Sequence, residues 1–519
     1  MIIHTKAKTK IHSHEAKSTG IKGHNVYSVK RSPKIKSATA IMQTMGKGTV
    51  RRRGKTTYRK STIHQNQEER GGRIHQHNRN IKDDKKMKGL LIKNAIIVPL
   101  DDVAREKDWF KGDIAIEGSV IKASGENLAE KFPDFDPIAG ENCLVMPGFV
   151  NCHTHAAMTM LRGYADDLPL RKWLQEMIWP REAHLSEDDI YWGTQLAILE
   201  MIKSGTTTFA DMYFFMNQTA KAVMESGIRA SLSRGMVGTG ESALLAIEEN
   251  IDLVKTWHGQ AAGRITCMFG PHAPYTCPPS YLEQVMNHAD KLGVGLHIHL
   301  AETVDEVEEI KLKYGKTPVD LMDSLGLFQG RHVLAAHCVH LTEKEMDLLA
   351  ENKVGIAHNP QSNMKLTSGI APVPQLLKKG ALVGLGTDGA SSNNNLDMLE
   401  EMSTCALLHK VSTGDSTVLA AKEVLRMATR GGALALGLEN VGSLEPGKKA
   451  DLIIFDLKQP HWTPLFNPIA NLVYAAQSAD IKTVIINGEI VMKDREVLTI
   501  DEERVLFEAE KHAQDLILK

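Results

Sequence analysis

The sequence predicts an α/β fold, a (β/α)8 TIM-type barrel with a small β-sandwich domain built from both ends of the folded region. Eight short apolar runs alternate with stretches of helical pattern across about 290 residues, which suits eight βα units closing into a barrel. Short β-rich runs precede and follow this alternation. The first of the eight runs ends in Asn-Cys-His-Thr-His, where a doubly wound sheet would need a glycine-rich phosphate turn. The doubly wound sheet is therefore the weaker alternative.

The candidate barrel strands leave room for a helix after each of the first seven. The clearest helix covers residues 186–203, where Ser186 and Asp189 form a capping box and Gly205 follows as a stop signal. We expect the barrel over residues 146–439. Its strands are predicted at 144–150, 206–212, 229–236, 264–270, 293–300, 332–336, 354–358 and 382–386.

Two segments that lie far apart in the sequence, 87–145 and 440–519, are expected to form the small β-sandwich domain. Both contain short runs rich in β-forming residues, and Asn487-Gly488 is a hairpin turn signal. The runs cover 91–98, 113–116, 120–123, 451–455 and 482–486.

Residues 1–86 differ in composition from the rest of the chain. Residues 1–87 hold 22 Lys and Arg against 5 Asp and Glu, a net charge of +17, while the remainder carries −18. The segment has few large apolar residues and no sustained periodicity, so we expect a basic, disordered extension that the chemistry does not need. Its cluster at 51–55, Arg-Arg-Arg-Gly-Lys, makes nucleic-acid binding the alternative from another functional class. A natural start at Met87 is a third interpretation.

The composition favours a cytoplasmic protein. No apolar run reaches the roughly 18 residues of a membrane-spanning helix, and the N-terminus lacks the apolar segment of a secretory signal. The six cysteines are scattered without a CxxC pair. This pattern argues against a zinc ribbon or a disulfide framework and indicates a reducing compartment.

Potential metal ligands recur at the ends of the predicted strands. His153 and His155 are separated by one residue, so both imidazoles can face one point from an extended segment. His299 closes the fifth predicted strand and Asp388 follows the eighth. Because the C-terminal ends of barrel strands converge on one face, these four side chains are predicted to bind one divalent metal, Zn²⁺ first and Fe²⁺ as the alternative. The fourth strand offers no lysine to bridge a second ion, which favours a single metal.

Glu302 and His337, together with the ligand Asp388, could handle protons at the same strand ends. A bound metal lowers the pKa of its water toward about 7, which makes a nucleophile available at neutral pH. Glu302 is expected to donate a proton to the substrate, Asp388 to accept the proton of water, and His337 to orient the attacking group. His297 faces the same way as His299. We choose His299 as the ligand because Glu302 then follows at a spacing of three, and we expect His297 to support it.

Six stretches of the chain resemble the amidohydrolase superfamily and, within it, the 5-methylthioadenosine/S-adenosylhomocysteine deaminase branch. The resemblance covers roughly residues 88–519, and its motifs are highly specific for the superfamily. They are MPGFVNCHTHAAMTMLRG (146–163), FGPHAPY (269–275), HIHLAET (297–303), AAHCVH (335–340), AHNPQSNMKL (357–366) and LGTDGASSNN (385–394).

The resemblance implies roles at individual positions. It gives metal binding to His153, His155, His299 and Asp388 and catalysis to Glu302 and His337. It further implies that Glu182 binds the ribose diol, Arg234 contacts substrate and His272 contacts the base, beside Glu302 and Asp388. The chain departs from the branch at Ala246, where an arginine that helps to hold the homocysteine carboxylate is expected. Methylthioadenosine or adenosine therefore ranks at least level with S-adenosylhomocysteine.

The implied reaction is hydrolytic deamination of an adenine nucleoside at C6, which gives the inosine derivative and ammonia. The nearest alternative is a triazine or chlorotriazine hydrolase of the same superfamily. The HxE and PCxxC signature of cytidine-type deaminases is absent from the sequence. We expect a nucleoside and water as partners, no membrane or nucleic-acid partner, and a homo-oligomeric assembly.

Overall fold

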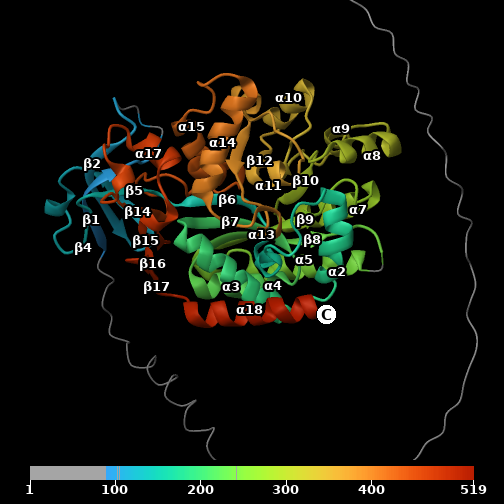
Figure 1. Cartoon of the computed structure of the whole chain (residues 1–519), viewed down its shortest axis with the longest axis horizontal. Helices are drawn as coiled ribbons and strands as arrows, with labels where there is room; N and C mark the ends of the chain where they lie inside the picture. The colour runs from blue at the N-terminus through green and yellow to red at the C-terminus, as the bar shows by residue number, and fades with distance from the viewer. Residues whose placement is uncertain (1–88, 102, 104–105, 241) are drawn as a thin grey trace, which may run out of the picture. The chain divides into compact units, whose positions relative to one another are not determined.

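The computed structural model describes residues 89–519 apart from 102, 104–105 and 241. The predicted extension over residues 1–86 lies outside this range. Within it, two sheets organise the chain, an eight-stranded sheet and a nine-stranded sheet (Figure 1). None of the described helices is long and apolar enough to cross a membrane.

The eight-stranded sheet is the predicted (β/α)8 barrel. Every neighbouring pair of its strands runs parallel. Its first and last strands meet where the amide of Asp388 donates to the carbonyl of His153, at 2.9 Å, and where Asn151 donates to Thr387, at 2.7 Å. The strands are β6 (Phe149–Thr154), β7 (Thr206–Tyr213), β8 (Arg229–Met236), β9 (Ile265–Pro271), β10 (Leu296–Leu300), β11 (Val333–His337), β12 (Gly355–His358) and β13 (Leu382–Leu385).

The first predicted barrel strand, 144–150, divides between the two sheets. β5 (Cys143–Pro147) belongs to the nine-stranded sheet, and β6 starts at Phe149 in the barrel. Gly148 lies at the crossing, where a Cβ atom would approach Thr207 to 2.1 Å, so only glycine fits. The residues on both sides of Pro147-Gly148 are apolar, so the segment resembles one strand although the Pro-Gly pair marks the change of sheet. As a result the HxH pair lies at the end of β6 and directly after it.

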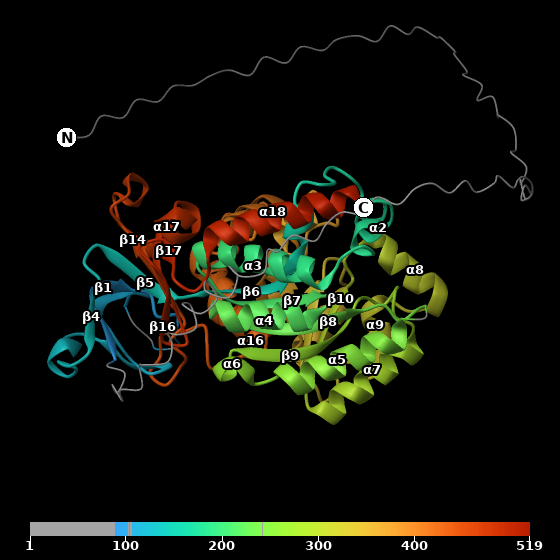
Figure 2. The same ribbon diagram turned by 90° about the horizontal axis from the view of Figure 1, so that it is seen from below.

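Helices surround the barrel. The predicted helix at 186–203 is present as α3 (Glu187–Lys203), with the expected capping box between Ser186 and Asp189. The last helix, α18 (Glu502–Leu518), runs along α3 in both views, and His512 bonds Asp189 across the contact at 2.6 Å (Figures 1 and 2). Other helices of at least six residues are α4 (Met216–Ser226), α5 (Ala243–Trp257), α7 (Pro279–Leu292), α8 (Val304–Tyr314), α9 (Pro318–Ser324), α10 (Glu343–Glu351), α11 (Pro360–Lys365), α12 (Val373–Lys378), α14 (Met398–Thr413), α15 (Ala421–Arg426) and α17 (Pro468–Tyr474).

The nine-stranded sheet joins both ends of the described chain, as predicted. Its order is β17-β16-β15-β14-β5-β1-β2-β3, with β4 on β1. Ile116 of β2 and Ile485 of β15 share one buried cluster, so the sheet folds over its own core in the manner of a sandwich. Asn487-Gly488 forms the predicted turn. The strands are β1 (Leu90–Ile97), β2 (Phe110–Glu117), β3 (Val120–Gly125), β4 (Asp136–Ala139), β14 (Leu452–Asp456), β15 (Ile481–Ile486), β16 (Glu489–Lys493) and β17 (Glu496–Val497).

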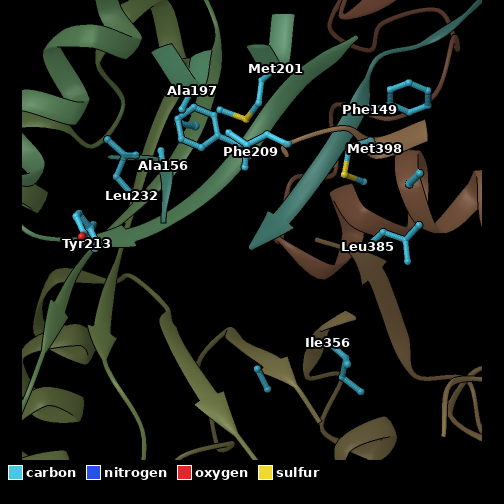
Figure 3. Packing of buried hydrophobic residues seen from close by; sticks show 14 of the residues in the cluster. Phe149, Ala156, Ala197, Met201, Phe209, Tyr213, Leu232, Ile356, Leu385 and Met398 are labelled. Carbon is cyan, nitrogen blue, oxygen red and sulfur yellow. The ribbon is translucent and has the colours of Figure 1, made fainter. Parts of the chain in front are cut away.

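The main core fills the space between the barrel strands and the helices. Figure 3 shows Phe209 of β7 beside Ala197 and Met201 of α3, and all three are fully buried. Each large side chain removed from water in this layer contributes roughly 1.5–3 kcal/mol. This packing fixes the strands whose ends carry the candidate site.

Candidate metal centre

Four side chains from three barrel strand ends meet at one point. Nε2 of His153 and Nε2 of His155 lie 3.5 and 3.4 Å from Oδ1 of Asp388. Nε2 of His299 lies 3.3 Å from Nε2 of His155. Four ligands placed tetrahedrally about 2.0–2.1 Å from a zinc ion are separated by similar distances. In addition, Nε2 of His153 is buried without a hydrogen-bond partner. These residues therefore fit a single divalent cation.

Backbone carbonyls orient two of the imidazoles. Nδ1 of His155 lies 2.6 Å from the carbonyl oxygen of Met212, and Nδ1 of His299 lies 2.8 Å from that of His272. When Nδ1 carries the proton and donates it to a carbonyl, Nε2 keeps a free lone pair for a metal. Nδ1 of His153 instead lies 2.9 Å from Nε2 of His297. His297 thus contacts the ligand His153 from the side away from the other ligand nitrogens, whereas His299 is one of the four ligands.

Burial keeps two of the ligand histidines, His153 and His299, neutral. It lowers the pKa of His153 to about 4 and that of His299 well below the ordinary value. Burial alone would raise the pKa of Asp388, but the His153 imidazole 3.5 Å away and the other nearby imidazoles hold that pKa well below the usual range. Neutral imidazoles and an ionised carboxylate are the forms that bind a cation.

Glu302 and His337 lie beside this cluster. Nε2 of His337 is 3.9 Å from Oε2 of Glu302 and 4.0 Å from Oδ2 of Asp388. Burial raises the pKa of Glu302. Burial opposes protonation of His337, yet the Glu302 and Asp388 carboxylates raise its pKa. A carboxyl group with a raised pKa and an imidazole between two carboxylates form a route for protons.

The backbone is strained at three residues where barrel strands end beside the site. Ala301, His337 and Asp388 have φ values of 53°, 72° and 62°, in the left-handed region that non-glycine residues rarely adopt. Such conformations persist where surrounding contacts hold them, and they concentrate at functional sites. Here they turn the chain sharply as each strand ends, at His337 and Asp388 themselves and directly before Glu302.

A cavity opens directly over the cluster. Its volume is about 100 Å³, and its wall includes His155, Glu182, His272, Glu302 and Asp388. A second space of about 500 Å³ shares Leu174, Trp179, Tyr275 and Glu302 with it. Together the two spaces form a path from outside to the candidate metal ligands.

Glu182 and His272, which the resemblance implies contact the substrate, both line the cavity. Glu182 ends α2 (Trp179–Glu182), which follows a π-helical turn over Trp173–Ile178. Burial raises the pKa of Glu182, while a hydrogen bond from Tyr213 acts against this. Nδ1 of His272 lies 3.0 Å from the Thr276 hydroxyl.

Arg234 lies at the edge of the cavity rather than in its wall. Its Nε donates to Oε2 of Glu249 at 2.7 Å, and its guanidinium stacks on the Phe214 ring. Phe214 and Gly235 line the cavity in its place. Ala246 is buried in α5, one turn before Glu249. The Arg234 guanidinium, which the resemblance implies contacts the substrate, is thus already paired with the Glu249 carboxylate.

Sequence reasoning missed several residues that support the site. Asp211 accepts hydrogen bonds from the Thr154 hydroxyl at 2.9 Å and the Ala156 amide at 2.7 Å, which fixes the loop of the HxH pair. Ser362 donates to Asp388 at 2.7 Å, and Asn363 bonds Nδ1 of His337 at 2.8 Å. Asp211 could have been suspected because it is a polar residue near a strand end. Ser362 and Asn363 lie in α11, and only the fold brings them to the site.

A second group with donor atoms of the right kind lies outside the cavity. His358, Cys405 and His409 are buried together where β12 meets α14. Nε2 of His358 and Nε2 of His409 are 3.2 Å apart, which one shared proton explains. His358 therefore packs against a helix and does not line the pocket.

A barrel whose strand ends gather three histidines and one aspartate beneath a cavity has the architecture of a metal-dependent hydrolase. The chain belongs to the amidohydrolase family, which matches residues 144–491.

Curated relatives cover nearly all of the described region. The chain is 58% identical over 436 residues to a 5-methylthioadenosine/S-adenosylhomocysteine deaminase from Pelotomaculum thermopropionicum, a match spanning 83% of this chain and 99% of the relative. A protein of the same name from Syntrophomonas wolfei is 57% identical, over 83% of this chain and 100% of its own length.

Solved structures give the same picture. An adenosine deaminase from Xanthomonas campestris with bound zinc is 36% identical, has a TM-score of 0.79, and covers 83% of this chain and 99% of its own. The atrazine chlorohydrolase of Arthrobacter aurescens TC1, complexed with zinc, is 26% identical with a TM-score of 0.77, over 82% and 100% of the two chains. The protein is accordingly a hydrolytic enzyme of the deaminase type.

Proposed function

We propose that the protein deaminates adenine nucleosides, with 5′-methylthioadenosine, S-adenosylhomocysteine and adenosine as the candidate substrates. Water adds at C6 of the adenine ring and ammonia leaves, so the products are the inosine derivative and ammonia. The observation that carries this proposal is that one cavity wall contains the candidate metal ligand Asp388, the proton donor Glu302 and the carboxylate of Glu182. The names of the curated relatives support it.

His153, His155, His299 and Asp388 would hold the metal. A divalent ion there, Zn²⁺ first and Fe²⁺ as the alternative, would lower the pKa of water and so supply the nucleophile. Asp388 accepts the proton of that water and returns it to the leaving ammonia. His337, within 4.0 Å of both carboxylates, keeps the attacking oxygen aligned.

Glu302 supplies the proton that the ring needs. Attack at C6 places negative charge on the adjacent ring nitrogen, and a carboxyl group with a raised pKa can donate a proton there. Glu182 can accept hydrogen bonds from both hydroxyls of a ribose, because a carboxylate offers two oxygens. His272 is proposed to contact the base, and Arg234 is proposed to contact the substrate.

One experiment separates this function from its nearest rival. Metal-loaded protein is incubated with methylthioadenosine, S-adenosylhomocysteine, adenosine and a chlorotriazine while ammonia and chloride are measured. Ammonia from at least one nucleoside is the expected result. Release of chloride alone would favour a triazine hydrolase. The zinc-bound atrazine chlorohydrolase has the same fold as this chain.

Two further assignments concern the setting of the enzyme. All six cysteines are free thiols in the described structure, which supports a reducing, cytoplasmic location. Homo-oligomerisation stays a prediction, which light scattering on the purified protein tests. The predicted nucleic-acid alternative for residues 1–86 is tested by the salt dependence of any affinity with and without that segment.

A further inference from the structure

Glu306 is a buried carboxylate beside the candidate proton donor. It lies in the first turn of α8 and only 3% of its surface is exposed. Both of its oxygens accept hydrogen bonds from backbone amides. Oε1 accepts from Ala301 at 3.0 Å, and Oε2 accepts from Glu302 at 2.8 Å. Burying a carboxylate costs free energy unless its oxygens accept hydrogen bonds, and here both oxygens do.

These two bonds are not the ordinary ones for a glutamate at this helix position. In a capping box, a glutamate in the first turn bonds the amide of the N-cap residue. The N-cap here is Thr303, whose hydroxyl accepts the Glu306 amide at 3.2 Å. The Glu306 side chain reaches past Thr303 to the two preceding residues. It therefore restrains the loop between β10 and α8 and not only the start of the helix.

The restrained loop needs such support. Ala301 has a φ of 53°, and a left-handed residue with a Cβ costs roughly 1–2 kcal/mol. The carbonyl of Ala301 accepts the amides of Val339 at 3.0 Å and His340 at 2.9 Å. Both residues follow β11, the strand that ends in His337. Ala301 thus joins the loops that carry the two proton-handling groups.

We propose that Glu306 is a positioning residue for Glu302, because its carboxylate fixes the backbone that aims the Glu302 side chain into the cavity. The inference rests on the proposed function, in which Glu302 is the proton donor. Glu306 is absent from the wall of the cavity over the metal ligands, where Glu302 lies, so it is proposed to act through Glu302.

A double-mutant cycle tests the proposal with methylthioadenosine as substrate. Glu306→Gln keeps one acceptor oxygen and turns a donor toward the other amide. We expect kcat to fall at least tenfold, KM to change less than twofold and metal content to stay constant. In a Glu302→Gln background the same substitution should lower kcat less than twofold further, since the side chain that it positions is already disabled. The matched control is Glu308→Gln, an exposed position on the same helix.

An equal loss of kcat in both backgrounds would overturn the proposal, because it would mean that Glu306 acts independently of Glu302. Amide hydrogen exchange on metal-loaded protein gives a readout that needs no substrate. Exchange at Ala301 and Glu302 should quicken in Glu306→Gln and not in Glu308→Gln, and unchanged exchange also rejects the proposal. If the wild-type protein deaminates no nucleoside, the proposed function fails. The exchange experiment still shows whether Glu306 restrains the backbone at Ala301 and Glu302. Glu306→Asp, one methylene shorter, replaces Glu306→Gln if the latter does not fold.

Discussion

The hydroxyl of Tyr213 donates a 2.7 Å hydrogen bond to Oε1 of Glu182. Tyr213 is the last residue of β7, whereas Glu182 ends a short helix in the long connection after β6. The bond ties an irregular connection to the rigid barrel. It also acts against burial, which raises the pKa of Glu182, and so favours the ionised form that would accept hydrogen bonds from a ribose.

Tyr213→Phe should therefore weaken nucleoside binding more than it slows chemistry. Loss of the bond costs roughly 1 kcal/mol, so KM for methylthioadenosine should rise about fivefold with a smaller change in kcat. Steady-state kinetics measures both constants. Tyr281→Phe is the matched control, because the Tyr281 hydroxyl bonds the Ala243 carbonyl at 2.7 Å away from the cavity. A KM that stays constant in Tyr213→Phe would remove the proposed role of this bond.

Metal content should distinguish the two groups of potential ligands. His299→Ala removes one of four ligands, so the bound metal should fall from about one ion per chain to less than a tenth, with activity lost in parallel. His409→Gln, which changes the group at His358, should keep its metal. Elemental analysis after dialysis gives the ratios. Loss of metal from His409→Gln but not from His299→Ala would mean that the ion binds at His358, Cys405 and His409, and it would refute the assignment.

Much of the fold was accessible from sequence because barrel strands are short apolar runs separated by helices with clear caps. The crossing at Gly148 was missed because the apolar residues on both sides of Pro147-Gly148 were taken as one strand, although a Pro-Gly pair is a turn signal. The metal cluster was predictable because barrel topology brings strand ends together whatever their separation in the sequence.

The residues that support the cluster were much less accessible. Asn363 and Ser362 contact His337 and Asp388 only because α11 folds back over the strand ends. The pairing of Arg234 with Glu249 depends on side-chain directions that no motif specifies. Contacts of this kind are set by packing and not by spacing along the chain.

Asp211 should make the metal-free protein less stable as the pH rises. Burial raises its pKa from 3.8 to about 6. Below about pH 4 the Asp211 side chain is protonated in both the folded and the unfolded protein. Between pH 4 and about pH 6 it ionises in the unfolded chain but stays protonated in the folded protein, so rising pH favours the unfolded state. Stability relative to Asp211→Asn should thus decline by up to roughly 3 kcal/mol between pH 4 and 7. Urea unfolding at several pH values measures this, with the exposed Asp188→Asn as baseline. A constant difference across that range would contradict the prediction.

Glu249 should influence which nucleoside is preferred. Its carboxylate occupies the Arg234 guanidinium, which would otherwise be free to attract the carboxylate of a homocysteine tail. Glu249→Gln should raise kcat/KM for S-adenosylhomocysteine severalfold relative to methylthioadenosine, which has no such carboxylate. Competition between the two substrates in one assay reports the ratio directly. Glu248→Gln is the neighbouring control, and an equal shift in both variants would point to general charge and not to this pair.

A buried ion pair holds the barrel against the nine-stranded sheet. Nε of Arg229, at the start of β8, donates to Oδ2 of Asp451 at 2.7 Å, and both side chains are at most 5% exposed. Asp451 also accepts the Asn487 amide at 2.6 Å. Asp451→Ala leaves a buried guanidinium without its partner, which costs about 3–5 kcal/mol. Thermal and urea unfolding should show this loss, whereas Glu117→Ala, which breaks the exposed pair with Lys122, should cost less than about 1 kcal/mol. Equal effects of the two substitutions would mean that the buried pair contributes no more than a surface one.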